Sequence, residues 1–124
     1  MIVCWSVKGG SGTTVVSGAL AVMLGARSNA GARVVDLAGD LPATLGMAEP
    51  AGLGVSDWLM SPDEVDPDAL ENLLISASAN LSVLPRGTTH MDETSRFELL
   101  ANTLASLHQP VVVDAGSGAA RSPF

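Results

Sequence analysis

The sequence has few of the residues that build metal centres and nucleophilic sites. It contains one cysteine, two histidines and no tyrosine among 124 residues. A lone cysteine cannot by itself build a zinc or iron–sulfur centre. Cys4 lies in an apolar run, where we expect a small buried side chain in a reducing compartment. His90 and His108 are isolated and lack metal-ligand spacing, so we expect surface or helix-end roles for both.

Basic residues are also few. Six lysines and arginines stand against 13 acidic residues, which gives a net charge of −7, and the basic residues are scattered along the chain. A negatively charged surface repels the phosphate backbone of DNA. We therefore expect no direct nucleic-acid binding.

Long apolar runs are missing, although 47% of the residues are hydrophobic. No run reaches the roughly 20 residues that a membrane span requires. The chain enters an apolar segment at Ile2 with no basic leader. We expect a cytoplasmic protein with no membrane segment and no signal peptide, folded as a single domain over residues 1–124.

The chain opens instead on a feature typical of phosphate binding. An apolar run, residues 2–7, leads into a glycine-rich loop, and a helical pattern begins at Thr13. Glycines let consecutive backbone N–H groups turn toward an anion at the positive end of the following helix. The sequence therefore predicts a nucleotide polyphosphate as ligand. The candidate binding residues are Lys8, Gly9, Gly10, Ser11, Gly12, Thr13 and Thr14.

The loop departs from the usual phosphate-loop pattern at one position. That pattern has a lysine and then a serine or threonine after the last glycine, and these contact the outer phosphates and magnesium. Here Thr13 stands at the lysine position, whereas Thr14 keeps the hydroxyl. A lost lysine–phosphate contact weakens binding by about 1.5–3 kcal/mol, which leaves room for binding through the backbone and magnesium.

Strand-like and helical patterns alternate along the chain. Apolar runs at residues 2–7, 33–36, 81–84 and 110–114 are typical of buried strands, and helical patterns cover about 13–27 and 92–107. This alternation predicts an α/β fold in three layers, with a parallel sheet of about four strands flanked by helices.

Three details of the helices follow from the same patterns. The helix at 13–27 is apolar nearly all round, so we expect it to be buried. Asp66 is a cap for a helix that turns Leu70, Leu73, Leu74 and Ala77 inward. Trp58 lies in a short amphipathic segment and is expected in the core, with a partner contact as the alternative.

Two apolar runs end in a carboxylate. Asp36 closes the second run, and Asp114 closes the last, before Ala-Gly-Ser-Gly. The carboxyl ends of parallel strands face the ligand crevice of an open α/β sheet. Asp114 therefore resembles a Walker B aspartate, which holds magnesium through its water shell.

Together these features resemble the MinD/ParA family of P-loop ATPases. Its deviant loop, Lys-Gly-Gly-x-Gly-Lys-Thr, is present at residues 8–14 except for the second lysine. The resemblance implies a P-loop NTPase fold that binds ATP and Mg²⁺, with Thr14, Asp36 and Asp114 at the metal. It also implies an ATP-sandwiched homodimer, in which Lys8 reaches the phosphates of the partner subunit.

The resemblance puts catalysis in doubt. The family commonly shows Asp-x-Asp where this chain has Asp36 and Ala38, and the second acid orients the attacking water. Asp40 is the candidate substitute, although Gly39-Asp40-Leu41-Pro42 is equally typical of a turn. With Lys8, Asp36 and Asp40 as the candidate catalytic residues, we expect slow hydrolysis or none.

Three segments look most like the CpaE/TadZ branch of the family, which marks positions for pilus or secretion machinery at a cell pole. They are Gly-Asp-Leu at 39–41, Gly-Leu-Gly-Val-Ser-Asp-Trp-Leu at 52–59 and Leu-Ser-Val-Leu-Pro-Arg-Gly at 81–87. This implies a nucleotide-dependent dimerisation and positioning switch with a protein partner at a pilus, secretion or division site. The resemblance covers only the first half of the family's domain, so the domain is expected to be incomplete, with run 2–7 as an exposed apolar edge.

Two other interpretations remain. Gly10-x-Gly12 followed by Asp36 mimics a dinucleotide-binding Rossmann fingerprint, although Val15 stands at the third glycine. Alternatively, Thr13 and Ala38 favour a scaffold or interaction protein that keeps the fold and binds no nucleotide.

Overall fold

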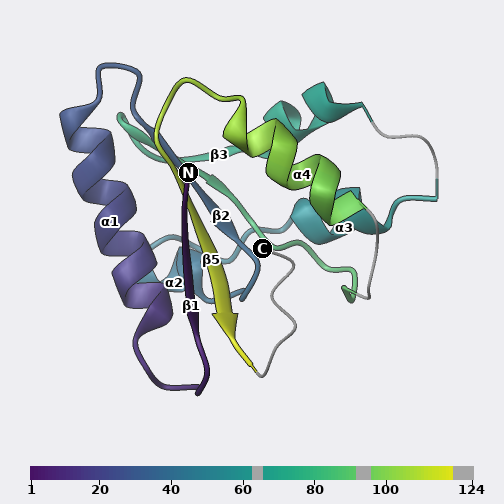
Figure 1. Ribbon diagram of the computed structural model, residues 1–124, viewed down its shortest axis with the longest axis horizontal. Helices are drawn as coiled ribbons and strands as arrows, with labels where there is room; N and C mark the ends of the chain where they lie inside the picture. The colour runs from purple at the N-terminus through teal and green to yellow at the C-terminus, as the bar shows by residue number, and fades with distance from the viewer. Residues whose placement is uncertain (63–65, 92–95, 119–124) are drawn as a thin grey trace.

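The computed structural model contains a five-stranded sheet with helices on both faces (Figure 1), described for residues 1–62, 66–91 and 96–118. In spatial order the strands are β1 (Ile2–Ser6), β5 (Val111–Ser117), β2 (Ala32–Asp36), β4 (Leu81–Leu84) and β3 (Ile75–Ser78). The pairs β1–β5, β5–β2 and β2–β4 are parallel, and β3 is antiparallel to β4. The predicted α/β fold class is confirmed.

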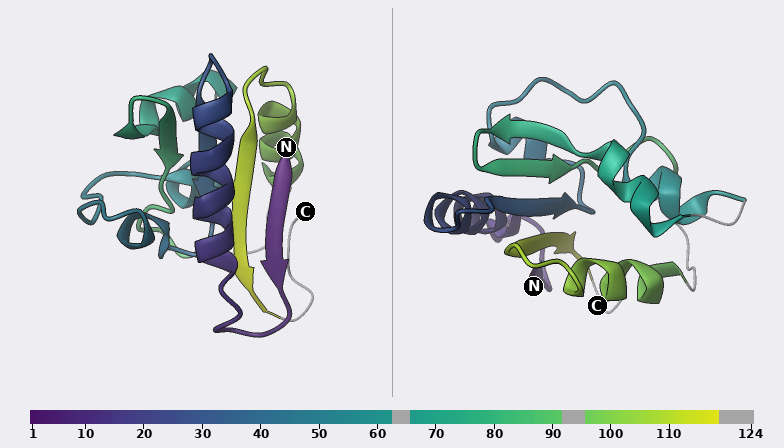
Figure 2. Two further views of the ribbon diagram at one scale, coloured as in Figure 1. Left: turned by 90° about the vertical axis from the view of Figure 1, so that its left-hand side faces the viewer. Right: turned by 90° about the horizontal axis from the view of Figure 1, so that it is seen from above.

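The helices complete three layers (Figure 2). On one face lie α1 (Thr13–Arg27) and α2 (Leu41–Thr44). On the other face lie α3 (Val55–Met60), the 3₁₀ helix η1 (Pro67–Leu73) and α4 (Arg96–Ala105). The predicted helix over 92–107 is confirmed for the part from Arg96, and residues 92–95 lie outside the described residues.

Valine-rich strands bury both faces of the sheet. Successive side chains of a strand point to opposite faces. Val34 therefore packs in the core under α1, whereas its neighbour Val35 packs in the core under α3 and α4. Trp58 is 4% exposed in this second core, and its indole Nε1 donates to the Asp66 carbonyl at 3.2 Å. The expectation that Trp58 belongs to the core is confirmed.

The prediction that α1 is buried is wrong for its outer side. Only the side facing the sheet is covered, and it carries small residues, among them Gly18 and Gly25. A Cβ at Gly25 would come within 2.5 Å of the Asn80 carbonyl oxygen, so glycine permits this close approach. The outer side keeps its apolar residues in solvent, with Val15, Val16, Val22 and Met23 each more than half exposed.

The segment after Asp66 differs from the predicted helix. The cap is present, because the Asp66 side chain accepts a hydrogen bond from the Asp68 N–H, but only η1 follows it. The chain then enters β3, a strand absent from the prediction. The alternating sequence Ile75-Ser-Ala-Ser78 suits an edge strand, and pairing with β4 stabilises it over a helix.

The sheet order excludes the Rossmann alternative. In that fold the first strand lies beside the second, whereas here β5 lies between β1 and β2. The same order places β1 at an edge, as expected, with Ile2, Val3 and Trp5 between 36% and 45% exposed. None of the described helices is both long and apolar enough to cross a membrane.

Candidate phosphate-binding site

The loop between β1 and α1 takes a conformation that requires glycine. Gly10 and Gly12 have φ angles of 76° and 78°, which side-chain-bearing residues rarely adopt. Gly12 is also the N-cap of α1, and the first turn of α1 contains no acidic residue. The loop therefore presents unsatisfied backbone N–H groups and the positive end of a 15-residue helix, and no acidic side chain in the first turn competes for them.

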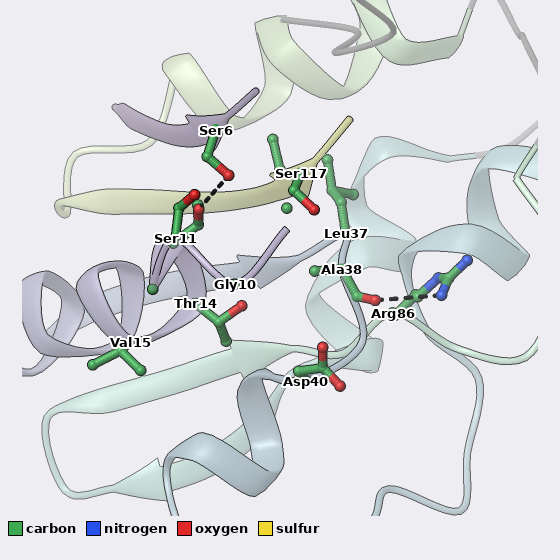
Figure 3. Close-up of a pocket in the computed structure, with 14 residues that line it drawn as sticks. Ser6, Gly10, Ser11, Thr14, Val15, Leu37, Ala38, Asp40, Arg86 and Ser117 are labelled. Carbon is green, nitrogen blue, oxygen red and sulfur yellow. Dashed lines mark hydrogen bonds between the residues drawn. The ribbon is translucent and has the colours of Figure 1, made fainter. Parts of the chain in front are cut away.

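This helix end opens into a cavity of about 480 Å³ at the carboxyl ends of the parallel strands (Figure 3). Four segments line it: the phosphate loop, the turn after β2, the residue Arg86 after β4, and the end of β5. Its described lining contains no aromatic side chain, so these residues offer polar and backbone groups rather than a surface on which a base would stack. The lining residues are Ser6, Gly10, Ser11, Gly12, Thr13, Thr14, Val15, Leu37, Ala38, Asp40, Arg86, Ala115, Gly116 and Ser117.

The two threonines of the loop have different surroundings. The hydroxyl of Thr13, at the usual lysine position, donates to the Ser6 hydroxyl at 2.8 Å, which ties the start of α1 to the end of β1. Thr14 also lines the cavity, and within the described part of the chain its hydroxyl has no hydrogen-bond partner. The Thr14 hydroxyl is thus available to a metal ion.

Lys8 does not line this cavity. Its side chain is exposed, whereas its carbonyl oxygen accepts hydrogen bonds from the hydroxyls of Ser11 at 2.5 Å and Ser6 at 3.1 Å. These two contacts close the loop around the Lys8 peptide. The ammonium group itself points to no described partner.

Asp36 shapes the turn after β2. Its buried carboxylate accepts hydrogen bonds from the backbone N–H groups of Gly39 at 2.6 Å, Ala38 at 3.0 Å and Leu41 at 3.2 Å. Burial raises the pKa of Asp36, the three N–H groups lower it, and the neighbouring Asp114 raises it, with a net upward shift. Both carboxylate oxygens are therefore engaged by the turn and do not line the cavity.

Asp114 lies beside Asp36 in the register of β2 and β5 and is fully buried. One carboxylate oxygen accepts from the Gly116 N–H at 3.1 Å, but Oδ2 has no partner among the described residues. A buried carboxylate oxygen without a donor is costly unless a cation or its water satisfies it. The unpartnered oxygen is therefore compatible with a nearby cation or its water. The described residues contain no cluster of three acidic, histidine or cysteine side chains that could hold a metal alone.

Asp40 is the N-cap residue of α2, but its side chain makes no capping hydrogen bond. It is exposed and lines the cavity opposite the phosphate loop. The structure thus brings Asp40 together with Thr13 and Thr14 in the lining. Of the other predicted site residues, Lys8, Gly9, Asp36 and Asp114 do not line the cavity, although Asp114 directly precedes the lining residues Ala115 and Gly116.

Sequence reasoning missed Arg86, Ser6 and Ser117 as lining residues. A signal for Arg86 was present, because it follows β4 directly after Pro85 and the carboxyl ends of parallel strands face the crevice. Ser117 follows Asp114 closely, but only the extension of β5 to Ser117 shows that it faces the loop.

No protein-family model matches the sequence, and no curated protein matches it. Solved structures do. The chain is similar to a ParA family ATPase from Chlorobium tepidum TLS, with 22% identity, a TM-score of 0.74, and coverage of 98% of this chain and 54% of that one. A plasmid partition protein from Borrelia burgdorferi has 20% identity and a TM-score of 0.61, with coverage of 91% of this chain and 53% of that one.

Cobyrinic acid a,c-diamide synthase from Mycobacterium smegmatis has 22% identity and a TM-score of 0.57, with coverage of 92% of this chain and 49% of that one. The chain thus spans about half the length of each of these structures. At these identities the likeness establishes the fold. The chain has the mostly parallel, helix-flanked P-loop fold that the ParA family ATPase structure shares.

Proposed function

We propose that this chain binds a nucleoside triphosphate, ATP, together with Mg²⁺ in the 480 Å³ cavity. The observation that supports this best is the arrangement at the start of α1. Gly10 and Gly12 adopt left-handed backbone conformations in the loop that leads into α1. The N-terminus of α1 faces a cavity at the carboxyl ends of the parallel strands. Such an arrangement favours phosphate groups.

In this proposal different groups of the chain contact different parts of the ligand. Backbone N–H groups of residues 9–14 bind phosphate oxygens. The Thr14 hydroxyl and, through water, the orphaned Asp114 Oδ2 hold Mg²⁺. The ion would neutralise charge on the phosphates when bound.

We propose that hydrolysis is slow or absent. Thr13 supplies no charge, and its hydroxyl is hydrogen-bonded to Ser6. Ala38 stands where a second acid would orient the attacking water, so Asp40 is the acidic residue that remains in the described lining. A phosphate-release assay with Mg-ATP should give turnover well below about 1 s⁻¹, the low end for enzymes. Turnover at or above that rate would contradict this part of the proposal, and Asp40→Asn should remove any residual activity.

We further propose that ATP controls self-association, as in a CpaE/TadZ-like positioning switch with a protein partner at a pilus, secretion or division site. The side chain of Lys8 supports this, because it is exposed at the mouth of the loop rather than committed to its own cavity. Sedimentation velocity should show a dimer with Mg-ATP for the wild type and a monomer for Lys8→Ala. A monomer in both would contradict the switch but not the binding.

Binding itself is tested by isothermal titration calorimetry with Mg-ATP. We expect saturable binding for the wild type and a loss of about tenfold or more in affinity for Thr14→Ala. Thr103→Ala is the matched control, because the Thr103 hydroxyl donates to the Leu99 carbonyl within α4, far from the loop. Equal affinities of the wild type and both variants would show that ATP binds at another site.

A scaffold that has lost its ligand is the second candidate function. The bond from Thr13 to Ser6 favours it, because the hydroxyl closes the loop without any phosphate. In that case the folded wild type gives no heat with Mg-ATP.

A further inference from the structure

Among the described residues that line the cavity, Arg86 is the one with a positively charged side chain. Asp40 is the only other charged residue in this described lining. Lys8 is absent from it, and Thr13 stands at the usual lysine position. A triphosphate carries several negative charges, so a cavity that binds it is expected to supply a cation as well as N–H groups. Arg86 is the side chain of this lining that can do so.

The backbone of Arg86 is held firmly by the start of α3. The Arg86 carbonyl accepts from the Ser56 N–H at 2.8 Å, and the preceding Pro85 carbonyl accepts from the Val55 N–H at 2.8 Å. Gly87 follows with a φ of 88°, packed directly against Gly54. The two segments that resembled the CpaE/TadZ branch, 52–59 and 81–87, thus dock on each other at this point.

Asp57 secures the far side of the same loop. Its carboxylate accepts from the N–H groups of Gly54 at 2.8 Å, Thr88 at 3.1 Å and Thr89 at 3.2 Å, and from both threonine hydroxyls. A segment with this many fixed contacts positions its side chain without paying a large ordering cost when a ligand binds. The backbone that carries the Arg86 side chain is therefore held in place before a ligand binds.

The guanidinium group keeps most of its hydrogen-bonding capacity. Nη1 donates weakly to the Ala38 carbonyl at 3.4 Å, and the stem packs against Gly39. Within the described residues no carboxylate oxygen lies within 4.0 Å of it. Arg86 also lines a smaller cavity of about 190 Å³, so the group has space in which to turn. Figure 3 shows it across the pocket from Ser11 and Thr14, beyond Ala38.

We propose that Arg86 binds the outermost phosphate of the triphosphate and supplies the charge that Thr13 omits. This inference rests on the proposed function. It adds a second phosphate-binding group to the same site, besides the backbone N–H groups of the loop. The fork of guanidinium N–H groups suits bidentate contact with phosphate oxygens. Because the outermost phosphate is absent from ADP, Arg86 then selects ATP over ADP.

The test compares ATP and ADP affinities, each with Mg²⁺, by calorimetry on the 124-residue chain. Arg86→Gln keeps a donor for the Ala38 carbonyl but removes the charge, and we expect ATP affinity to fall by roughly 10–150-fold while ADP affinity changes less than about threefold. Arg86→Lys keeps the charge and should retain most of the preference for ATP. Arg27→Gln, at the far end of α1, is the control and should match the wild type.

The outcomes separate this inference from the proposed function. If the wild type binds ATP and Arg86→Gln weakens ATP and ADP equally, Arg86 has only a structural role and the inference is wrong. Unchanged ATP affinity in Arg86→Gln also overturns it. If the folded wild type binds neither nucleotide, the proposed function fails and takes the inference with it.

Discussion

Asp36 and Asp114 place two buried carboxyl groups side by side at the ends of neighbouring strands. Asp36 is compensated by three backbone N–H groups, whereas Asp114 Oδ2 has no described partner. Like charges in a buried site oppose each other, and Asp114 contributes to the raised pKa of Asp36. Without a cation, this pair destabilises the fold.

Removing one charge should therefore stabilise the free protein. We predict that Asp114→Asn raises the free energy of unfolding by on the order of 1 kcal/mol without ligand. The same change should abolish any further stabilisation by Mg²⁺ with ATP. Urea unfolding with and without Mg-ATP measures both effects. A destabilised variant that still responds to Mg-ATP would contradict the role given to Asp114.

Asp57 gives a prediction with a defined pH dependence. Burial alone would raise the pKa of Asp57, but hydrogen bonds from Thr89, Gly54 and Thr88 outweigh it and lower the pKa from 3.8 to about 2. A lowered pKa means that the carboxylate stabilises the fold fully above pH 3.8 and loses this contribution as the pH falls toward 2.

We expect Asp57→Asn to lower the free energy of unfolding at pH 7 by about 1–2 kcal/mol. Its difference from the wild type should shrink between pH 3.8 and pH 2, where the wild-type carboxylate becomes protonated. Asp68→Asn is a suitable control, because it is an exposed acid in η1 without these contacts. A difference that stays constant with pH would contradict this account of Asp57.

The junction between α3 and the end of β4 depends on two glycines. A Cβ at Gly54 would lie 2.2 Å from the Pro85 carbonyl oxygen and 2.3 Å from the Gly87 nitrogen. Since backbone atoms cannot move aside as a flexible side chain can, any larger residue at Gly54 must separate α3 from the loop that carries Arg86.

Gly54→Ala should accordingly destabilise the protein by about 1–3 kcal/mol or more and weaken ATP binding through displacement of Arg86. Gly52→Ala is the matched control, because a Cβ at Gly52 meets nothing within 4 Å. Thermal unfolding and calorimetry on the two variants test this. Equal stability of the two variants would show that α3 and the loop can move apart at little cost in stability.

Among the elements, those fixed by local signals were predicted well. The apolar runs gave β1, β2, β4 and β5 to within a few residues, because buried parallel strands need continuous valine and leucine. The strand β3 was missed because Leu70, Leu73 and Leu74 also fit helical spacing. Only the hairpin with β4 stabilises the extended state.

The surroundings of α1 could not be deduced from its own sequence. A helix that is apolar all round indicates burial all round, but the described sheet covers one side only. The glycine loop, in contrast, was predicted from local backbone requirements alone, and Gly10 and Gly12 take the expected left-handed conformation. The position of Arg86 after β4 indicated the crevice, but the contacts that hold it there join segments some 30 residues apart, such as Ser56 with Arg86, and the local sequence does not show them.

The described residues leave large apolar side chains exposed on two elements, α1 and β1. The helix α1 packs partly against the edge strand β1, and the exposed residues of α1 lie on its side away from the sheet. Surfaces of this kind bind other apolar groups. The residues are Ile2, Val3, Trp5, Val15, Val16, Val22 and Met23.

We predict that the purified 124-residue chain binds the dye ANS while folded, and that Val22→Glu lowers the dye fluorescence by about half because it places a charge within this surface. Asn102→Glu, on the exposed side of α4, should leave the fluorescence unchanged. Equal dye binding by both variants would show that the dye binds at another surface.

The central claim is that the cavity between the glycine loop and Arg86 binds Mg-ATP, and NMR chemical-shift mapping on the ¹⁵N-labelled chain tests it most directly. The account predicts that titration with Mg-ATP shifts the amide signals of Gly9 to Thr14, Ala38 to Asp40, Arg86 and Gly116 most strongly. Unchanged spectra at millimolar Mg-ATP, or shifts confined to the opposite face of the sheet around α4, would contradict it.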